Sequence, residues 1–373
     1  MRFRRVCLES LGYVLPDEAI TSDEIESRLE PLYRRLRLPA GRLELMTGIR
    51  ERRFWGRGTL PGDVSIRSGR RAIEAAEIDP ARIGLLIHAS VCRDHLEPAT
   101  ACRVHHALGL REDCLVYDLS NACLGVLNGI VQAAAMIELG QIEAALVVSG
   151  EGSRSLVETT IASLNRDEHW TRQSVKLAVA SLTIGSASVG VVVCSEAISR
   201  TGNRLLGGHA VARTEHHQLC HSGADEAGGD GMAPLMATDS ERLMAEGIAT
   251  GAACWNGLLA TLELAPEAID RTCCHQVGAS HRRAMLEALG RSPEHDYATF
   301  EYLGNTGSAA LPVSLALGAK SGFYRPGDRV GLLGIGSGIN SVMLGIEWHA
   351  TRIAGDDPLA ERMPWGTVAA DAT

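Results

Sequence analysis

The chain has 373 residues, a length that is generous for one simple domain and comfortable for two similar halves. Hydrophobic residues make up 45% of it and charged residues 22%, which favours a large buried core and excludes a mainly disordered chain. The formal net charge of -9 disfavours a nucleic-acid partner, because such binding needs clustered Lys and Arg side chains.

Targeting and membrane segments are not expected in this sequence. The first residues, from Met1 to Ala19, contain no long apolar core and no small-residue cleavage site, so they do not read as a signal peptide. No stretch reaches the roughly 18 apolar residues that a membrane span needs. The ten cysteines form no regular C-x-x-C pairs. We therefore expect a reduced, cytoplasmic protein in which most cysteines are small buried hydrophobic residues.

Strands and helices alternate through the first part of the chain. The apolar run over 83–90 is typical of a strand buried on both faces, and its alternation with helices predicts a parallel sheet with crossover helices. The expected elements are a strand over 6–14, a helix capped at 21–24, a helix over 64–76, the strand over 83–90, a helix over 99–108, a strand over 114–119, a helix over 121–139 and a strand over 144–149.

The same rhythm returns near the C-terminus. Cys92 and Cys123 are 31 positions apart (123 minus 92), and His275 and Asn305 are 30 apart (305 minus 275). Because the spacing repeats while the residue identities barely match, we infer an internal duplication of a βαβ-rich unit. The expected elements are a strand ending at 275, a helix over 281–289, a strand over 298–302, a helix over 308–320 and a strand over 329–333.

The expected organisation has three parts. The stretch over 153–239 contains a helical segment, an apolar strand over 189–194 and a Gly- and His-rich loop, and it is expected to supply loops and a cap over the site. The polar end of the chain is expected to be flexible. The parts are a first half over 1–200 with the cap insertion, a second half over 201–350 and a tail over 351–373.

Cys123 is the first candidate for chemistry. It follows a predicted buried strand and stands at the start of a predicted long helix, near unpaired backbone N–H groups and the positive end of the helix dipole. That setting lowers a thiol pKa from about 8.5 toward roughly 7 or below. The alternative is a buried packing cysteine.

His275 and Asn305 strengthen the case for Cys123. Each is expected at the carboxyl end of a strand, where open α/β sheets place their ligand sites. Alone, His275 would be interpreted as a core or surface residue, and Asn305 as a turn residue in a Gly-Asn-x-Gly sequence. Three such residues at equivalent edges of a duplicated fold favour a shared site.

Five short segments resemble the ketoacyl synthase III branch of the thiolase superfamily. The resemblance runs in order over about 1–348. It implies an α/β thiolase fold, in which two similar βαβαβ halves form a five-layered αβαβα sandwich, and a catalytic set of Cys123, His275 and Asn305. The segments are 47–53 (TGIRERR), 120–125 (SNACLG), 274–277 (CHQV), 304–308 (GNTGS) and 334–338 (GIGSG).

A narrower resemblance lies within that branch. The segment over 90–100 (SVCRDHLEPAT) is similar to one in the olefin-biosynthesis thiolases that join two fatty acyl-CoAs head to head. In that subfamily the glutamate of this segment acts as a base in the neighbouring subunit's site, a role that falls on Glu97. The resemblance implies a homodimer or a heterodimer with a homologous subunit. The alternative is that Glu97 is an ordinary surface-loop residue before Pro98.

The chemistry of condensation assigns further roles. Thiolate nucleophiles hold acyl groups well, and developing oxyanions need preorganised donors. We expect the backbone at Cys123, Ser337 and Gly338 to supply such donors. Joining two unactivated acyl thioesters also needs a general base, which suits Glu97. Strand-end Glu151 is a second acid, equally well explained as a helix cap.

Ligand contacts are the remaining expectation. Paired arginines in this chain are interpreted as solvated helix faces or as a landing site for a phosphate-bearing group such as coenzyme A. Arg52, Arg53 and Gly336 are the predicted substrate-binding residues. No metal and no cofactor beyond coenzyme A thioester substrates is expected, since the His and Cys residues over 216–221 fit no zinc template.

The favoured hypothesis is a non-decarboxylative Claisen condensation of two long-chain acyl-CoA molecules through acyl-Cys123, giving a 2-alkyl-3-ketoacyl product. The alternatives are a decarboxylative synthase that uses a malonyl group on acyl carrier protein, and an acyltransferase to oxygen or nitrogen of a natural product. A binding subunit with a degenerate site is a fourth hypothesis, disfavoured by the intact Cys, His and Asn set.

Overall fold

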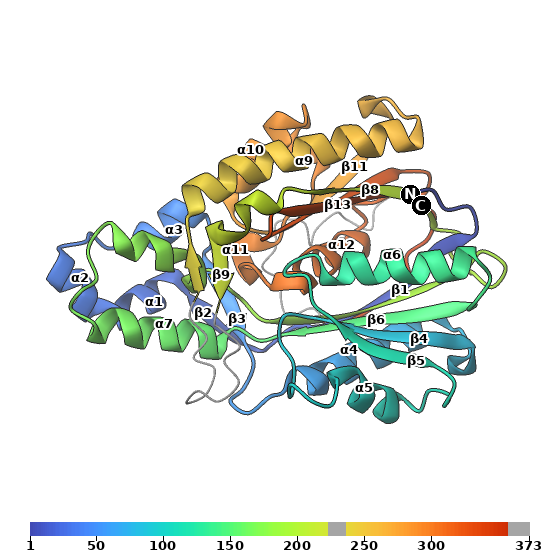
Figure 1. Cartoon of the computed structure of the whole chain (residues 1–373), viewed down its shortest axis with the longest axis horizontal. Coiled ribbons are helices and arrows are strands. Elements are labelled where there is room, and N and C mark those ends of the chain that lie inside the picture. The colour runs from blue at the N-terminus through green and yellow to red at the C-terminus, as the bar shows by residue number, and fades with distance from the viewer. Residues whose placement is uncertain (223–235, 357–373) are drawn as a thin grey trace, which may run out of the picture.

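The computed structural model describes residues 1–222 and 236–356, and its strands alternate with helices through the whole chain (Figure 1). The strands are β1 Val6–Val14, β2 Glu18–Thr21, β3 Glu51–Phe54, β4 Ile83–Ala89, β5 Leu115–Leu119, β6 Ala144–Glu151, β7 Ala187–Ser195, β8 Arg204–Ala212, β9 Cys220–Ser222, β10 Met236–Thr238, β11 Arg271–Cys274, β12 Arg329–Gly336, β13 Asn340–Glu347 and β14 Ile353–Ala354. The helices are α1 Ser22–Arg28, α2 Glu30–Leu36, α3 Arg42–Thr47, α4 Pro61–Ala76, α5 Thr100–Leu108, α6 Gly125–Glu138, α7 Arg154–Arg166, α8 Val179–Leu182, α9 Ser240–Leu262, α10 Ala279–Ala288, α11 Phe300–Leu303 and α12 Ala310–Lys320.

The main sheet is mixed. Its strand order is β11-β12-β13-β8-β1-β7-β6-β4-β5, with β14 beside β1. The β4–β5, β4–β6 and β11–β12 pairs are parallel, as the alternation of strands and helices predicts. The β6–β7, β1–β7, β12–β13 and β8–β13 pairs are antiparallel, so the sheet also contains antiparallel strands that the local alternation does not predict.

The chain forms five layers, which confirms the predicted thiolase-type sandwich. Helices α4 and α5 cover one face of β1 and β4–β7, and α9 and α10 lie on the outer side of β8 and β11–β13 (Figure 1). Helices α6 and α12 lie between the two groups of strands and contact both. β1 pairs with β8 at Cys7 and Arg204, and Arg2 forms a further bridge with Gly207. The central helices pack against both groups of strands.

The largest hydrophobic cluster spans both halves. Leu8 of β1, Leu127 of α6, Val313 of α12 and Leu332 of β12 belong to it, and each is at most 2% exposed. Burial of each such side chain contributes roughly 1.5–3 kcal/mol relative to exposure.

No helix among the described residues is long and apolar enough to cross a membrane.

The stretch over 153–239 contains the strand predicted over 189–194, which is β7, and one central strand that was not predicted, β8. The Gly- and His-rich loop of this stretch lies partly outside the described residues. The expected strand over 298–302 is the short helix α11 instead. The α7 segment does lie outside the sheet, where it packs against α2.

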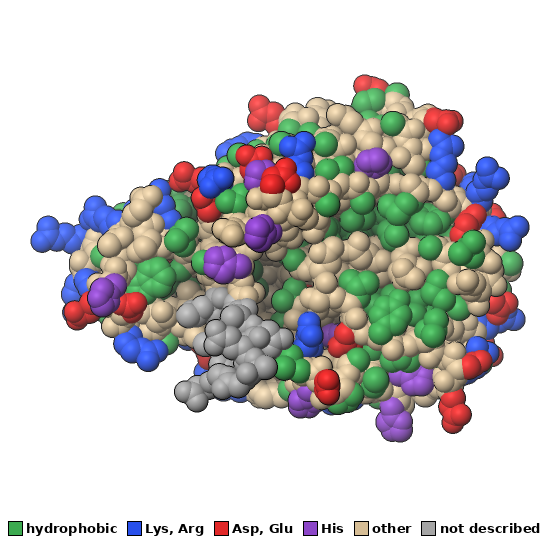
Figure 2. All heavy atoms as spheres, viewed as in Figure 1, with side chains coloured by type: hydrophobic (Ala, Val, Ile, Leu, Met, Phe, Trp, Pro, Cys, Tyr) green, Lys and Arg blue, Asp and Glu red, His purple; other side chains and the backbone are tan. Residues whose placement is uncertain are grey.

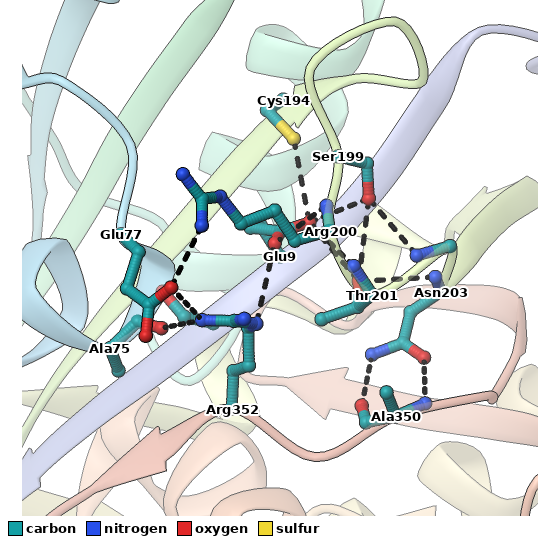
Figure 3. A network of polar contacts seen from close by, with 12 residues as sticks. Glu9, Ala75, Glu77, Cys194, Ser199, Arg200, Thr201, Asn203, Ala350 and Arg352 are labelled. Carbon is teal, nitrogen blue, oxygen red and sulfur yellow. Dashed lines mark hydrogen bonds and ion pairs between the residues drawn. The ribbon is translucent and has the colours of Figure 1, made fainter.

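The first part of the predicted flexible tail is held in place. β14 pairs with β1, and the Arg352 guanidinium lies 3.2 Å from the Glu77 carboxylate and 4.0 Å from that of Glu9 (Figure 3). Glu9 is fully buried and accepts a hydrogen bond from Ser199 Oγ at 2.6 Å. These contacts fix residues up to 356, while residues 357–373 lie outside the described part of the chain.

Candidate active site

Cys123 lies in a tight turn between β5 and α6. Helix α6 begins at Gly125, so the cysteine precedes the helix instead of standing within its first turn as predicted. Ala122 has a φ of 45°, and the N–H of Leu124 donates to the carbonyl of Asn121 at 2.9 Å. A Cβ atom at Gly125 would lie 3.1 Å from the carbonyl oxygen of Ala89, so a side chain there would have to displace the end of β4 slightly.

The thiol of Cys123 is not activated in advance. Burial, followed by the negative charge of Glu151, raises its pKa to about 12. The prediction of a lowered pKa is therefore wrong, because desolvation outweighs the helix start that lies beyond the cysteine. The residue rests as a neutral thiol, and its proton must leave as the sulfur attacks.

The turn between β12 and β13 adjoins Cys123. A Cβ atom at Gly336 would lie 3.5 Å from the backbone nitrogen of Cys123. The side-chain amide of Asn340 donates to Oδ1 of Asn121 at 3.4 Å. Ser337 and Gly338, the predicted oxyanion residues, lie between these two contacts.

His275 directly follows β11. Its backbone N–H donates to the carbonyl of Leu333 at 3.0 Å, which fixes it beside the end of β12, the strand that reaches Cys123. The side chain is 3% exposed and Nδ1 has no hydrogen-bond partner among the described residues. Burial, followed by the neighbouring charge of His281, lowers the pKa of His275 to about 3. The imidazole is neutral, so one ring nitrogen donates and the other accepts.

Asn305 follows helix α11, not a strand. Its backbone N–H donates to Thr183 at 3.0 Å, and its carbonyl accepts from Gly185 at 2.9 Å. Its Oδ1 accepts the N–H of Gly307 at 3.1 Å, so it also shapes its own turn. Ser308 ends that turn, and a Cβ at Gly125 beside Cys123 would lie 3.4 Å from its Cβ. The structure thus brings the Cys123, His275 and Asn305 segments to one edge of the sandwich.

Glu151, which the sequence leaves open between a second acid and a helix cap, lies beside the segments of this candidate site. It is 4% exposed at the end of β6, and its carboxylate accepts hydrogen bonds from Ser308 Oγ and from the N–H of Val91. No side-chain cap hydrogen bond forms at the start of α7, but Oε1 accepts the N–H of Ser308 at 3.2 Å, in the turn that leads into α12. The only sequence signal was an acidic residue at a strand end.

Glu97 is not joined to Cys123 by any contact within one chain. It lies in the exposed segment between β4 and α5 and makes no hydrogen bond or ion pair with a described residue. The carboxylate is therefore free to act at a surface. Its assignment as a base stays a prediction.

Arg52 and Arg53 do not form a phosphate-binding surface. Arg52 is 0% exposed and donates to Ser22 Oγ at 3.1 Å, while burial lowers its pKa to about 10. Arg53 is 3% exposed and donates to the carbonyl of Pro16 at 2.9 Å. Neither guanidinium is available to an incoming phosphate. Arg52 instead supports the site, since a Cβ at Gly304 would lie 3.1 Å from its Cβ.

The histidines over 216–221, for which no metal site is predicted, contact other residues of the chain. His216 pairs with Glu246 at 3.3 Å, and His217 Nδ1 lies 3.1 Å from the carbonyl oxygen of Thr214. Across residues 1–222 and 236–356, no cluster of three or more His, Cys, Asp or Glu residues is arranged to hold a metal ion.

The chain is similar to known proteins over most of its length. Residues 259–348 match the family model of the C-terminal part of 3-oxoacyl-[acyl-carrier-protein] synthase III, and residues 117–165 match a second model of that synthase. An acyl-CoA:acyl-CoA alkyltransferase of Shewanella oneidensis is 44% identical over 351 residues, covering 93% of this chain and 100% of the relative. One of Xanthomonas campestris is 34% identical over 348 residues, with the same coverage of 93% and 100%.

Two solved structures of one relative are similar to this chain over most of its length. The Xanthomonas campestris OleA with a cysteine replaced by alanine superposes with a TM-score of 0.87 at 33% identity, over 93% of this chain and 98% of that one. A cysteine-to-serine variant of the same protein, with bound lauric acid and lauroyl-CoA, also gives a TM-score of 0.87 at 33% identity, over 93% and 100% of the two chains.

Proposed function

Because the chain belongs to the acyl-CoA:acyl-CoA alkyltransferase family of thiolase-fold condensing enzymes, we propose that it joins two fatty acyl-CoA molecules head to head. The observation that carries the proposal is the position of Cys123, in a turn enclosed by the β12–β13 hairpin, with His275 and the Asn305 turn at the same edge. Such a site can hold an acyl group and stabilise oxyanions around it.

The first half of the reaction loads the enzyme. The Cys123 sulfur attacks the thioester carbonyl of the first acyl-CoA. The bond from that carbonyl to the coenzyme A sulfur breaks, and the thiol proton leaves with free coenzyme A. The backbone N–H of Cys123 and the turn at Ser337 and Gly338 stabilise the oxyanion between these events. A neutral thiol suits this step, since no separate thiolate has to survive in a buried site.

The second half forms the carbon–carbon bond. A general base, Glu97 of a neighbouring subunit, takes the proton from Cα of the second acyl-CoA. His275 and Asn305 stabilise the resulting enolate by hydrogen bonds to its oxygen. The carbanion attacks acyl-Cys123, the sulfur leaves and regains a proton, and a 2-alkyl-3-ketoacyl-CoA results. No malonyl group, carrier protein or further cofactor is needed.

We propose a homodimer that forms along β5. This strand is the edge of the sheet, and its five residues are exposed or only half-buried although four of them are apolar. An unpaired apolar edge favours association with another strand. Leu96 and Val91 of the Glu97 segment are 57% and 45% exposed, and Figure 2 shows further hydrophobic side chains on the face where α6 runs. Pairing there would carry Glu97 toward the neighbour.

A reducing compartment such as the cytoplasm is part of the proposal. All ten cysteines are free, including the adjacent pair Cys273 and Cys274. Disulfides are rare in reducing compartments, and a free nucleophilic thiol would be exposed to oxidation elsewhere.

The test uses the purified chain with one long-chain acyl-CoA and no malonyl donor. We expect free coenzyme A and, after hydrolysis and loss of CO₂, a ketone with one carbon fewer than the two chains combined. Cys123→Ser should remove both, whereas Cys102→Ser, a change at an exposed cysteine, should keep both. Strict dependence on malonyl-carrier protein would overturn the proposal in favour of a decarboxylative synthase.

A further inference from the structure

We propose that Glu151 is a positioning residue for condensation, which anchors the root of the Glu97 segment to the turn that carries Asn305. In a dimer, this anchor would set the position of the base that one subunit offers to its neighbour. The inference rests on the proposed function and deepens it, because it assigns the residue that connects the segment of the base, Glu97, to the turn of Asn305.

The contacts of Glu151 join three elements. Its Oε1 accepts from Ser308 Oγ at 2.6 Å, from the N–H of Ser308 at 3.2 Å and from the N–H of Val91 at 3.1 Å. Its Oε2 accepts from the N–H of Cys92 at 3.4 Å. Val91 and Cys92 begin the segment that ends at Glu97, and Ser308 ends the turn of Asn305. One side chain on β6 therefore fixes both functional segments.

The anchor also reaches the neighbourhood of Cys123. Ser308 Oγ lies 2.7 Å from the carbonyl oxygen of Ala89, which a Cβ at Gly125 would nearly touch. A Cβ at Gly307 would lie 3.0 Å from Cδ of Glu151, so the turn is packed directly onto the carboxyl group. The carboxylate is therefore separated from the nucleophile turn by Ser308 and the end of β4.

The site is built for a carboxylate. Glu151 is buried and forms no ion pair with a described residue, so its charge is balanced by neutral donors alone. Each buried charge of this kind is costly unless every lone pair finds a donor. Glutamine would keep one acceptor oxygen, but its NH₂ group would face the N–H of Cys92 or of Val91. Both groups are donors, so that hydrogen bond would be lost. A purely space-filling role would not need the charge.

Acylation and condensation should respond differently to Glu151. Transfer of the first acyl group needs Cys123 and its oxyanion donors, which the β12–β13 hairpin supports independently. Condensation also needs a base and an enolate stabiliser held in register, where small displacements cost large factors in rate. Loss of the anchor should therefore slow carbon–carbon bond formation and spare the loading of Cys123.

The rate of alkylation of Cys123 gives a second test of Glu151, because the charge of Glu151 acts on neighbouring ionisable groups. The charge of Glu151 acts on Cys92, Cys123 and the buried His88. Its removal should lower the pKa of the Cys123 thiol, so that alkylation of Cys123 becomes faster at neutral pH. A residue that merely stabilised the fold would not produce faster alkylation together with slower condensation.

The decisive experiment uses mixed dimers. A Cys123→Ser subunit paired with a Glu97→Ala subunit has one complete site, whose base comes from the first subunit. We expect ketone formation from acyl-CoA to fall at least tenfold when Glu151→Gln is added to the Cys123→Ser subunit, while acyl-Cys123 still forms on the other. Glu143→Gln, a change at an exposed glutamate just before β6, should have no effect when it is added to the same Cys123→Ser subunit.

Each other outcome has a defined meaning. Unchanged ketone formation by the Glu151→Gln hybrid overturns the anchor and leaves the proposed function intact. An inactive reference hybrid overturns the transfer of Glu97 between subunits, and the anchor with it. A wild-type enzyme that makes no ketone from acyl-CoA alone overturns the proposed function itself. If Glu151→Gln lowers the unfolding temperature, the same hybrid is made with Ser308→Ala instead. That change keeps Glu151 and removes the hydroxyl that donates to its carboxylate at 2.6 Å.

Discussion

Gly336, the last residue of β12, packs against the backbone nitrogen of Cys123. A Cβ atom at this glycine would lie 3.5 Å from that nitrogen and 3.2 Å from Cγ of Leu124. The hairpin therefore holds the N–H group that we propose as an oxyanion donor. The nucleophile belongs to the first half of the chain and its support to the second, so the site exists only when the two halves pack together.

Gly336→Ala should slow acylation of Cys123 several-fold. The added methyl group must displace Leu124, and overpacking of this kind costs about 1–3 kcal/mol. The burst of free coenzyme A on mixing with acyl-CoA measures the rate, and thermal unfolding measures the stability. Gly56→Ala is the matched control, since the nearest atom to its Cβ would lie 3.8 Å away. A wild-type burst in Gly336→Ala would show that the hairpin does not position the turn.

Glu97→Ala should form acyl-Cys123 at the wild-type rate and lose ketone formation. Glu97 is exposed and without a hydrogen-bond partner among the described residues, so its loss should leave the fold stable. Intact mass reports the acyl adduct and gas chromatography the ketone. Glu112→Ala, at another exposed glutamate, serves as the control. Ketone formation at the wild-type rate by Glu97→Ala would refute the assignment of the base.

Mixing Glu97→Ala with Cys123→Ser subunits should restore activity that neither variant has alone. Each mixed dimer would contain one site with an intact Cys123 and a base from the neighbour. If Glu97 served the site of its own chain, every site would lack one of the two residues and the mixture would stay inactive.

The reactivity of Cys123 should rise with pH well above neutrality. Its pKa is raised to about 12 by burial and by the charge of Glu151, so little thiolate exists near neutral pH. Alkylation by iodoacetamide, followed by peptide mass, should still be accelerating above about pH 9. Cys102, which is exposed, provides the internal reference in the same digest. A plateau near pH 7 would indicate an activated thiolate and contradict the structure.

Mild acid should destabilise the fold through His275, which is buried, and His281, which is half-buried. Burial lowers the pKa of His275 to about 3 and that of His281 to about 4, below the ordinary value of about 6.5. Between those values the unfolded chain binds protons that the folded chain excludes, so stability is complete above about pH 6.5 and falls as the pH drops toward the folded values. Each histidine should cost about 2 kcal/mol at about pH 5.

Urea unfolding at about pH 7.5 and about pH 5 measures that loss. His281→Asn should reduce the difference between the two pH values, because one of the two proton-binding groups is gone. His106→Asn, at an exposed histidine, should not change it. Equal stability of the wild type at both pH values would contradict the neutral state of these side chains in the folded protein.

The predictable part of the fold follows from strong local patterns. The strand predicted over 6–14 is β1, and the helix predicted over 99–108 differs from α5 by one residue at its start. β8 was missed because its two consecutive glycines and its alternating burial give no continuous apolar run. Its place in the sheet comes from pairing with β13, more than a hundred residues later, which no local pattern encodes.

The site was predictable where chemistry and strand ends coincide. Cys123 and His275 follow strands β5 and β11, as expected. The role of Glu151 stays open in the sequence because its partners, Val91 and Ser308, lie 60 and 157 positions away. Arg52 was expected at the surface by its charge, but tertiary packing encloses it behind the Asn305 turn.

The central claim is that an acyl group on Cys123 is joined to a second, unactivated acyl-CoA. The most direct measurement loads the enzyme with one acyl chain, removes free coenzyme A, and adds an acyl-CoA of a different chain length in a single turnover. We predict a ketone that contains both chains, with its carbonyl carbon from the preloaded one. Release of the preloaded chain only as free fatty acid, or a product that appears only with a malonyl thioester, would contradict the account.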